Sequence, residues 1–121
     1  MLPTLARVAV ALIAALHVYI LVLEMFLWTT PRGHRAFGLT PDFARATKAL
    51  AANQGLYNGF LVAGLVWSLI GSEAIQYEVR VFFLSCVVIA GIYGGLTAVR
   101  TILFAQAAPA IAALAVTMLA H

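Results

Sequence analysis

Charged side chains are scarce in this sequence. Only 9% of its 121 residues are Asp, Glu, Lys or Arg, while 64% are hydrophobic. A soluble domain of this size would need more polar side chains to cover its surface. The composition therefore argues against an ordinary soluble domain and predicts an integral membrane protein whose main partner is the lipid bilayer.

Cysteine and the familiar catalytic motifs are also scarce. The single cysteine, Cys86, excludes an internal disulfide and a four-cysteine zinc site, and its apolar surroundings predict a small packing residue. The sequence has no HExxH or Glu-x-x-His pattern, glycine-rich phosphate loop or dinucleotide fingerprint. We therefore expect no metal site, and the sequence names no cofactor. The net charge of +3 is ordinary loop bias for a membrane protein and gives no reason to expect nucleic acid.

Long apolar stretches account for most of the chain. Four of them, at about residues 5–28, 50–70, 79–99 and 102–120, are long enough to cross a bilayer, which takes ~20 residues each. The connections between them are short. The sequence therefore predicts an all-α fold, a four-transmembrane-helix bundle that forms a single domain over residues 1–121. The first stretch exceeds signal-peptide length and has no clean cleavage site, so we expect it to be retained.

The connections contain a few local signals. Residues 29–47 read as a loop in which Thr40-Pro41-Asp42 predicts a helix start, with Thr40 as N-cap and Pro41 in the first helical position. That helix could run straight into the second span. Glu73 to Arg80 reads as a short polar connection, and Pro109 predicts a bend in the fourth span or a place near its start.

Basic residues in the connections predict the orientation. With four spans, the first and third loops lie on one side and carry five basic residues, Arg32, Arg35, Arg45, Lys48 and Arg100. The other side carries two, Arg7 and Arg80. Because Lys and Arg concentrate in cytoplasmic loops, we expect a multi-pass protein of the inner (plasma) membrane, with the basic first loop in the cytoplasm and both termini outside.

Polar side chains concentrate at one end of the predicted spans. The second span opens on the heptapeptide from Asn53 to Gly59, where amides and a phenol enter an apolar run. Polar groups inside a membrane are costly and mark a functional site. All four spans place such groups in the same leaflet, so we predict one polar chamber. Its members are Glu24, Asn53, Gln54, Tyr57, Asn58, Tyr93, Thr97, Arg100 and Gln106, and His17 lies at its floor.

Two members of the first span are candidates for acid/base chemistry. His17 and Glu24 lie seven residues apart and share a helix face, with His17 ~10 Å deeper in the membrane. A carboxyl group removed from water favours its neutral form, which suits a proton carrier or general acid/base. The structural alternative is that Glu24 pairs with Arg100 or accepts a hydrogen bond from Asn58, and that the amides hold helices together.

The other leaflet has few polar groups. Ser68, Ser85 and Thr117 lie there, and their hydroxyls can bond the backbone of their own helices. Gly91-x-x-x-Gly95 has the spacing of a close helix contact, made either within the bundle or between copies of the chain in a homo-oligomer.

Several segments together resemble a known family. They are His17 with Glu24-Met25-Phe26-Leu27-Trp28, Arg35-Ala36-Phe37-Gly38-Leu39, Asn53 to Leu61, Ala90-Gly91-Ile92-Tyr93-Gly94 with Thr97, and Gln106-Ala107-Ala108-Pro109-Ala110. The chain resembles, over nearly its whole length, the small bacterial integral-membrane family catalogued as domain of unknown function 1304. The resemblance implies a four-helix membrane protein and no established activity.

A second resemblance is architectural. The basic first loop, the Asn53 helix start and the Tyr93…Arg100…Phe104 run are similar to the membrane-associated eicosanoid and glutathione metabolism superfamily. That superfamily implies four helices, often in trimers, and a glutathione site near the cytoplasmic leaflet. Its asparagine is followed three residues later by a glutamate. Leu56 stands there in this chain, so the sequence departs from the pattern of the glutathione site.

Three functions fit these observations. In the first, a cytoplasm-facing intramembrane pocket binds a small amphipathic or lipid-like ligand, with acid/base chemistry through Glu24 and His17. Asn53, Tyr57, Asn58 and Tyr93 would orient that ligand. In the second, the chain is a small oligomeric proton-coupled transporter whose membrane glutamate exchanges protons for substrate. In the third, it is a structural membrane subunit without catalysis. The sequence leaves open whether the protein is an enzyme.

Overall fold

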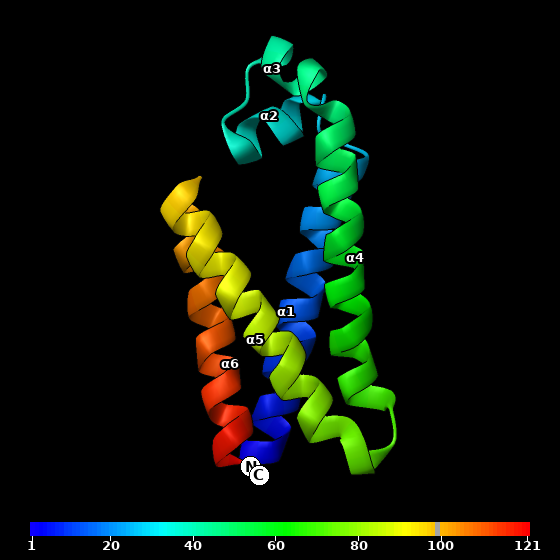
Figure 1. Cartoon of the computed structure of the whole chain (residues 1–121), viewed down its shortest axis with the longest axis vertical. Coiled ribbons are helices and arrows are strands. Elements are labelled where there is room, and N and C mark those ends of the chain that lie inside the picture. Colours follow the sequence, from blue (N-terminus) through cyan, green and yellow to red (C-terminus); the bar gives the residue numbers. More distant parts are fainter. Residues whose placement is uncertain (99) are drawn as a thin grey trace. The chain divides into compact units, whose positions relative to one another are not determined.

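The chain folds into two compact groups of helices. The computed structural model describes residues 1–98 and 100–121 (Figure 1). One unit combines Met1–Ala14 with Ala63–His121, and the other is Ala15–Val62. We name them the terminal unit and the central unit. The single domain over residues 1–121 stays a prediction.

Helices make up nearly all of the described residues. In chain order they are α1 (Leu2–Met25), α2 (Pro31–Phe37), α3 (Pro41–Ala46), α4 (Lys48–Ile70), α5 (Glu73–Thr97), the π-helix η1 (Leu103–Ala107) and α6 (Ala108–Leu119). Residues 1–98 and 100–121 contain no strand, so the all-α prediction is confirmed for them. α5 begins at Glu73, six residues before the predicted third span, and the predicted end of that span, Val99, lies outside the described residues.

Two of the described helices are long and apolar enough to cross a membrane, by length and composition. α1 has 24 residues and α5 has 25, and a span needs ~20. The apolar segment Leu103–Leu119 is shorter. α4 has 23 residues, but the amides near its start, including Asn53 and Asn58, interrupt its apolar run, and it is not one of the two helices that are apolar enough. The helices thus supply two clear membrane-length segments.

In the central unit, the connection between α1 and α4 is helical where the sequence predicts a loop. α1 ends at Met25, and α2 begins at Pro31 after Thr30, whose side chain accepts a hydrogen bond from the Gly33 N–H at 3.4 Å. α2 ends at Phe37, and the next residue, Gly38, caps it with a φ of 65°, which lies in the left-handed region that favours glycine. Three local features favour this short helix: an N-cap threonine, a proline in the first turn and a glycine directly after the last turn.

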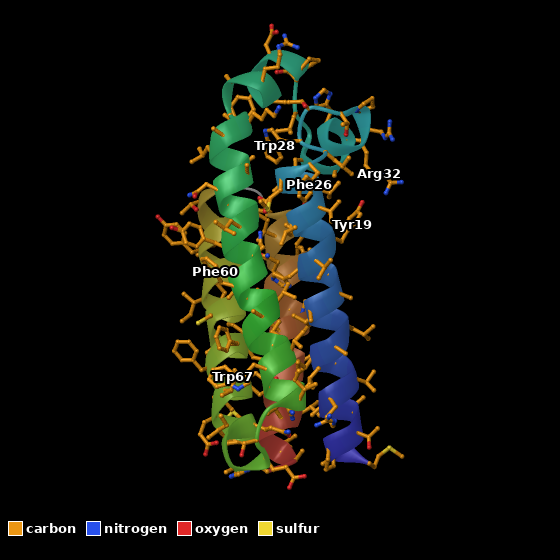
Figure 2. The ribbon with its side chains drawn as sticks, turned by 90° about the vertical axis from the view of Figure 1, so that its right-hand side faces the viewer. Tyr19, Phe26, Trp28, Arg32, Phe60 and Trp67 are labelled. Atoms are coloured by element: carbon orange, nitrogen blue, oxygen red, sulfur yellow. The ribbon has the colours of Figure 1, made fainter. Side chains whose placement is uncertain are left out.

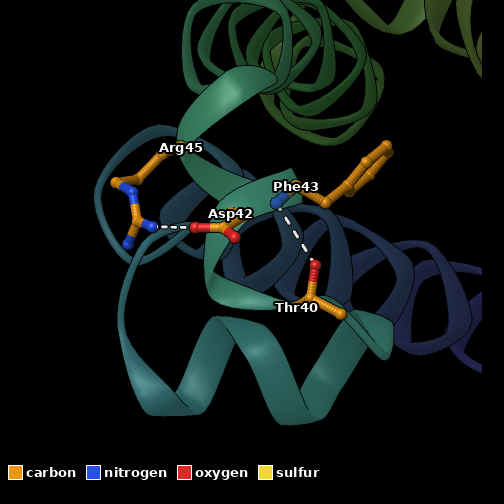
Figure 3. A network of polar contacts seen from close by, with 4 residues as sticks. All are labelled: Thr40, Asp42, Phe43 and Arg45. Atoms are coloured by element: carbon orange, nitrogen blue, oxygen red, sulfur yellow. Dashed lines mark hydrogen bonds and ion pairs between the residues drawn. The ribbon is translucent and has the colours of Figure 1, made fainter.

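α3 begins where the sequence predicts. The Thr40 hydroxyl accepts a hydrogen bond from the Phe43 N–H at 3.2 Å (Figure 3). Pro41 occupies the first helical position. The predicted direct run into the second span is wrong. Thr47 interrupts the helix with φ −107° and ψ 10°, and its hydroxyl donates to the Phe43 carbonyl at 2.7 Å. This local side-chain bond competes with continuation of the helix.

Trp28 ties this connection together. Its indole N–H donates to the Thr47 hydroxyl at 3.0 Å, and its ring lies 5.0 Å from that of Phe37. Gly33 is buried against Leu27, and a Cβ at position 33 would collide with the Leu27 carbonyl oxygen. The turn after α1 is therefore packed against α2 rather than left as an open loop.

In the terminal unit, α5 packs along η1 and α6 (Figure 1). A Cβ on Gly91 would lie 2.7 Å from the Ala107 nitrogen, and one on Gly95 would collide with the Leu103 side chain. The contact face predicted from Gly91-x-x-x-Gly95 is therefore used within the chain. A homo-oligomer would need a different surface.

The π-helix has a local cause. Pro109 lies in the first turn of α6, which is one of its two predicted places. Proline has no N–H, and its ring clashes with the carbonyl four residues earlier in a regular α-helix. The wider turn of η1, directly before α6, relieves this clash.

Side chains from two other helices satisfy the C-terminal carbonyls of α4. Arg7 of α1 donates to the Leu69 carbonyl at 2.9 Å, and Arg80 of α5 donates to the Ser68 carbonyl at 2.8 Å. Gln76 donates to the Gly71 carbonyl at 2.8 Å. Ser68 and Leu69 lie in the last turn of α4, where helix carbonyls lack a partner further along the helix, and the two guanidinium groups also complement the negative end of the helix dipole.

Two expectations for this region need correction. The sequence places Arg80 in a polar connection, but it is a buried residue of α5, 8% exposed. The Ser68 hydroxyl bonds the Leu65 carbonyl of its own helix at 2.7 Å, as expected. The Thr117 hydroxyl does not: it is buried and has no hydrogen-bond partner among the described residues.

Candidate functional site

A carboxylate–amide pair lies inside the central unit. The Asn58 side-chain nitrogen donates to Glu24 Oε1 at 2.6 Å, and it also lies 3.4 Å from the Gln54 carbonyl oxygen. Glu24 is 6% exposed and Asn58 is 8% exposed. This is one of the two pairings that the sequence leaves open for Glu24. A buried carboxylate needs such a donor, because an unpaired one is costly.

Two glycines of α4 bring that helix close to α1. A Cβ at Gly55 would lie 3.1 Å from the Glu24 Cβ and 3.3 Å from the Leu21 carbonyl oxygen. A Cβ at Gly59 would lie 3.2 Å from Leu21 Cδ1. The spacing of Gly55 and Gly59 places both on one helix face. This close contact holds Asn58 within reach of Glu24.

His17 lies on the same side of α1 as Glu24. Both side chains are buried, and His17 is fully so. Their separation of two helical turns corresponds to ~10 Å along the axis. A ligand or a water molecule between the two helical turns could therefore connect the two groups.

The other polar residues of the Asn53–Gly59 segment point elsewhere. Asn53 and Gln54 are exposed, and Tyr57 is 58% exposed with its ring 5.6 Å from that of Phe60. Gly55 and Asn58 form the buried face of the segment. Of the four predicted ligand-binding side chains in this segment, the structure therefore brings only Asn58 to Glu24.

The remaining predicted members belong to the terminal unit. Tyr93, Thr97 and Arg100 are exposed, and Gln106 is a partly buried residue of η1. The Thr97 hydroxyl donates to the Tyr93 carbonyl at 2.7 Å, so part of its hydrogen-bonding capacity serves its own helix. A common chamber for these residues and Glu24 stays a prediction.

No group of three His, Cys, Asp or Glu side chains in the described part of the chain could hold a metal ion. The buried polar side chains of the central unit are one carboxyl group, one amide and one imidazole, those of Glu24, Asn58 and His17. Such a set can bind a polar group of a ligand, accept or donate a proton, or hold two helices together.

Fold and site together define a class: a protein that is helical over its described residues, with two apolar helices of membrane-spanning length and a buried carboxylate–amide pair between α1 and α4. Within this class, residues 11–118 match the model of the family described as "Protein of unknown function (DUF1304)". The chain belongs to this family, as the resemblance predicts.

A relative in Lactococcus lactis subsp. lactis (strain IL1403) supports the assignment. It is described as "Uncharacterized protein YpaA" and is 31% identical over 114 residues, which cover 92% of this chain and 95% of the relative. No solved structure matches the chain.

Proposed function

We propose that this chain is an integral membrane protein that crosses the bilayer four times and binds a small amphipathic, lipid-like ligand beside Glu24. α1 and α5 support two of the spans by length and composition. α4 and the apolar segment Leu103–Leu119 would supply the other two. The connections between these four spans would then be short.

Exposed apolar side chains support the membrane assignment. Ile89 is 68% exposed, Leu96 is 74% exposed and Phe104 is 74% exposed. Aromatic side chains also project from the ribbons of α1 and α4 and from the turn after α1: Tyr19, Phe26, Phe60 and Trp67 (Figure 2). Soluble proteins rarely expose large apolar patches, whereas lipid tails would cover such side chains.

The proposed orientation places the α2–α3 connection in the cytoplasm. Arg32, Arg35 and Arg45 are exposed there. Basic side chains favour the cytoplasmic face and are attracted to anionic lipid head groups. Glu24 and Asn58 lie near that end of α1 and α4, so the ligand site would open toward the cytoplasmic leaflet.

The Glu24–Asn58 hydrogen bond is the observation that carries the proposal. A membrane helix keeps an ionisable side chain only at a cost, so its presence favours a functional role. Asn58 fixes the orientation of the carboxyl group without neutralising it, because an amide carries no charge. Glu24 then remains a proton acceptor or donor for a ligand, and His17 supplies a second titratable group deeper on α1.

Two rival functions use the same residues. A proton-coupled transporter would also need a membrane carboxylate, although transporter sites usually lie near the bilayer midplane, and Glu24 lies one residue before the end of α1. A structural subunit would contain the same bond purely as a helix–helix contact. The experiment must separate these cases.

The substitution Glu24→Gln separates the three functions. Glutamine keeps an oxygen that can accept the hydrogen bond from Asn58, but its side chain cannot ionise. We expect the wild-type protein, purified in detergent and analysed by native mass spectrometry, to retain a specific small molecule that the variant loses. Thermal stability should stay within ~1 kcal/mol of wild type, because the hydrogen bond is kept. Tyr19→Phe, at an exposed position of the same helix, serves as the control and should retain the molecule.

Two other outcomes would each favour one of the rival functions. A proton flux into liposomes that Glu24→Gln abolishes, without a retained molecule, would favour the transporter. An empty protein with no proton flux, unchanged by the substitution, would favour the structural subunit. Either result would contradict the proposed ligand site.

A further inference from the structure

A second polar site lies in the terminal unit, where α1 and α5 begin and α6 ends. It is a pocket of about 250 Å³ lined by Glu73, Tyr77, Glu78, Arg80, Thr117 and His121, among others. Liquid water takes ~30 Å³ per molecule, so the pocket has room for about eight waters or one small polar group of similar size. It is independent of Glu24 and Asn58.

Two buried donors in the lining have no acceptor. Arg80 is 8% exposed and Thr117 is 2% exposed. One guanidinium nitrogen of Arg80 donates to the Ser68 carbonyl, but its Nε has no hydrogen-bond partner among the described residues. The Thr117 hydroxyl has none there either. Buried donors without a partner are rare because each costs free energy, so these two point to an acceptor that the protein chain itself does not provide.

A charged oxygen would suit both donors. A guanidinium group forms strong hydrogen bonds with oxyanions, and a hydroxyl adds a second donor to the same group. The two atoms are shielded from bulk water, so an oxyanion would reach them only from inside the pocket, with a small shift of the neighbouring side chains.

The remaining lining favours a cation. Glu73 and Glu78 bring two carboxylates to the pocket, and no ion pair joins either one to a basic side chain among the described residues. The rings of Tyr77 and His121 stack with centroids 3.6 Å apart. Carboxylates beside an aromatic surface attract an ammonium group through charge and cation–π interactions. A simple anion would be repelled by the same carboxylates.

We propose that this pocket binds the head group of a zwitterionic phospholipid that carries a primary ammonium group. The phosphate accepts from Arg80 Nε and the Thr117 hydroxyl, and the ammonium lies beside Glu73 and Glu78. The pocket lies at the ends of three helices that would cross the bilayer, and such helix ends lie at the level of the lipid head groups. This position supports a membrane lipid as the source of the bound head group. This step rests on the proposed membrane insertion and not on the proposed role of Glu24.

Lipid retention measured by native mass spectrometry tests the assignment. Delipidated protein is titrated with phosphatidylethanolamine, phosphatidylglycerol and phosphatidylcholine of identical acyl chains. We expect phosphatidylethanolamine to be retained about tenfold more than the other two. Phosphatidylglycerol lacks the ammonium, and the quaternary ammonium of phosphatidylcholine cannot donate hydrogen bonds to the carboxylates. Equal or stronger retention of phosphatidylglycerol would overturn the proposal.

Thr117→Val is the most informative variant. Valine has the shape of threonine and removes the hydroxyl that lacks a partner, so the protein should fold and should be at least as stable as wild type. It should nevertheless lose most of its preference for phosphatidylethanolamine. Thr4→Val, at an exposed position in the first turn of α1, is the matched control and should keep the preference. An unchanged preference in Thr117→Val would contradict the proposed phosphate contact.

The carboxylates are tested separately. Glu78→Gln should weaken phosphatidylethanolamine binding if the ligand is a zwitterion, and should strengthen binding if it is a simple anion, which would overturn the proposal. Asp42→Asn removes one carboxylate charge in the central unit and serves as the charge control.

A soluble probe distinguishes the two sources of the head group. Glycerophosphoethanolamine should displace bound phosphatidylethanolamine from the wild-type protein. Binding of this soluble compound without retention of the lipid would assign the pocket to a free zwitterion and contradict the lipid assignment.

Discussion

The Glu24–Asn58 pair of the central unit and the Arg80 and Thr117 side chains of the terminal unit differ in whether their buried polar atoms have a partner. In the central unit, Glu24 receives a hydrogen bond from Asn58 at 2.6 Å. In the terminal unit, Arg80 Nε and the Thr117 hydroxyl have no partner among the described residues. Burial alone therefore does not indicate function. A satisfied pair is explained equally well by helix packing or by a site, whereas an unsatisfied donor requires something from outside the chain.

Two glycines of α5 in the terminal unit also differ in how closely they are packed, and this difference gives the largest expected effect. Gly91→Val should destabilise the protein by about 3 kcal/mol, because its Cβ would lie 2.7 Å from the backbone nitrogen of Ala107. Gly94→Ala is the control: its Cβ would meet only the Ile102 side chain at 3.4 Å. The free energy of unfolding, measured by denaturant titration in micelles, checks the pair. Equal effects of the two substitutions would contradict the close contact.

Asn58→Leu tests the satisfied pair. It removes the donor to Glu24 and leaves a buried carboxyl group without it, so we expect a loss of about 2 kcal/mol. The double variant Glu24→Met, Asn58→Leu should recover most of this loss, because both polar groups are then gone. The same titration measures both. A single variant as stable as wild type would show that the pair contributes nothing to folding.

Thr117→Val should change stability in the opposite direction. Removing a buried hydroxyl that has no partner should stabilise the protein by up to about 1 kcal/mol in the absence of ligand. The melting temperature of delipidated protein checks the sign. A destabilisation of similar size would show that the hydroxyl is bonded in the folded protein, and the contrast with the Glu24–Asn58 pair would then fail.

The exposed pair Asp42–Arg45 should matter least. Its side chains are largely exposed (Figure 3), and such pairs contribute roughly 0–1 kcal/mol. Asp42→Asn should therefore change the free energy of unfolding by less than about 0.5 kcal/mol, and high salt should remove even that difference. A larger loss would mean that the turn of α3 is held by charge rather than by its Thr40 cap.

Local signals in the sequence were sufficient for part of the fold. The all-α class follows from the apolar runs, and Thr40 with Pro41 marks the start of α3 because capping depends only on neighbouring residues. The same reasoning could have found α2, since Thr30-Pro31 and Gly38 are equally local signals. The interruption at Thr47 is harder to foresee, because its hydroxyl also accepts from Trp28, nineteen residues earlier.

The sites could be predicted only in part, because they depend on contacts between helices that the sequence does not show. Helical spacing groups Asn53, Gln54, Tyr57 and Asn58 on a broad arc, but it cannot tell which edge of that arc faces another helix. The structure buries only Asn58 of the four. The sequence predicts a connection for Arg80 because polar residues precede it from Glu73 on, and its partner, the Ser68 carbonyl, is reached only when the chain turns back after α4. The second pocket depends on the same turn.

The retention of a small molecule by wild-type protein and by Glu24→Gln is the most direct test of the proposed function. Both proteins are purified in the same detergent and analysed by native mass spectrometry, with their melting temperatures measured in parallel. The proposal predicts a specific bound molecule in the wild type, its loss in the variant, and closely similar melting temperatures. The same bound molecule in both proteins, or none in either, would contradict a ligand site at Glu24.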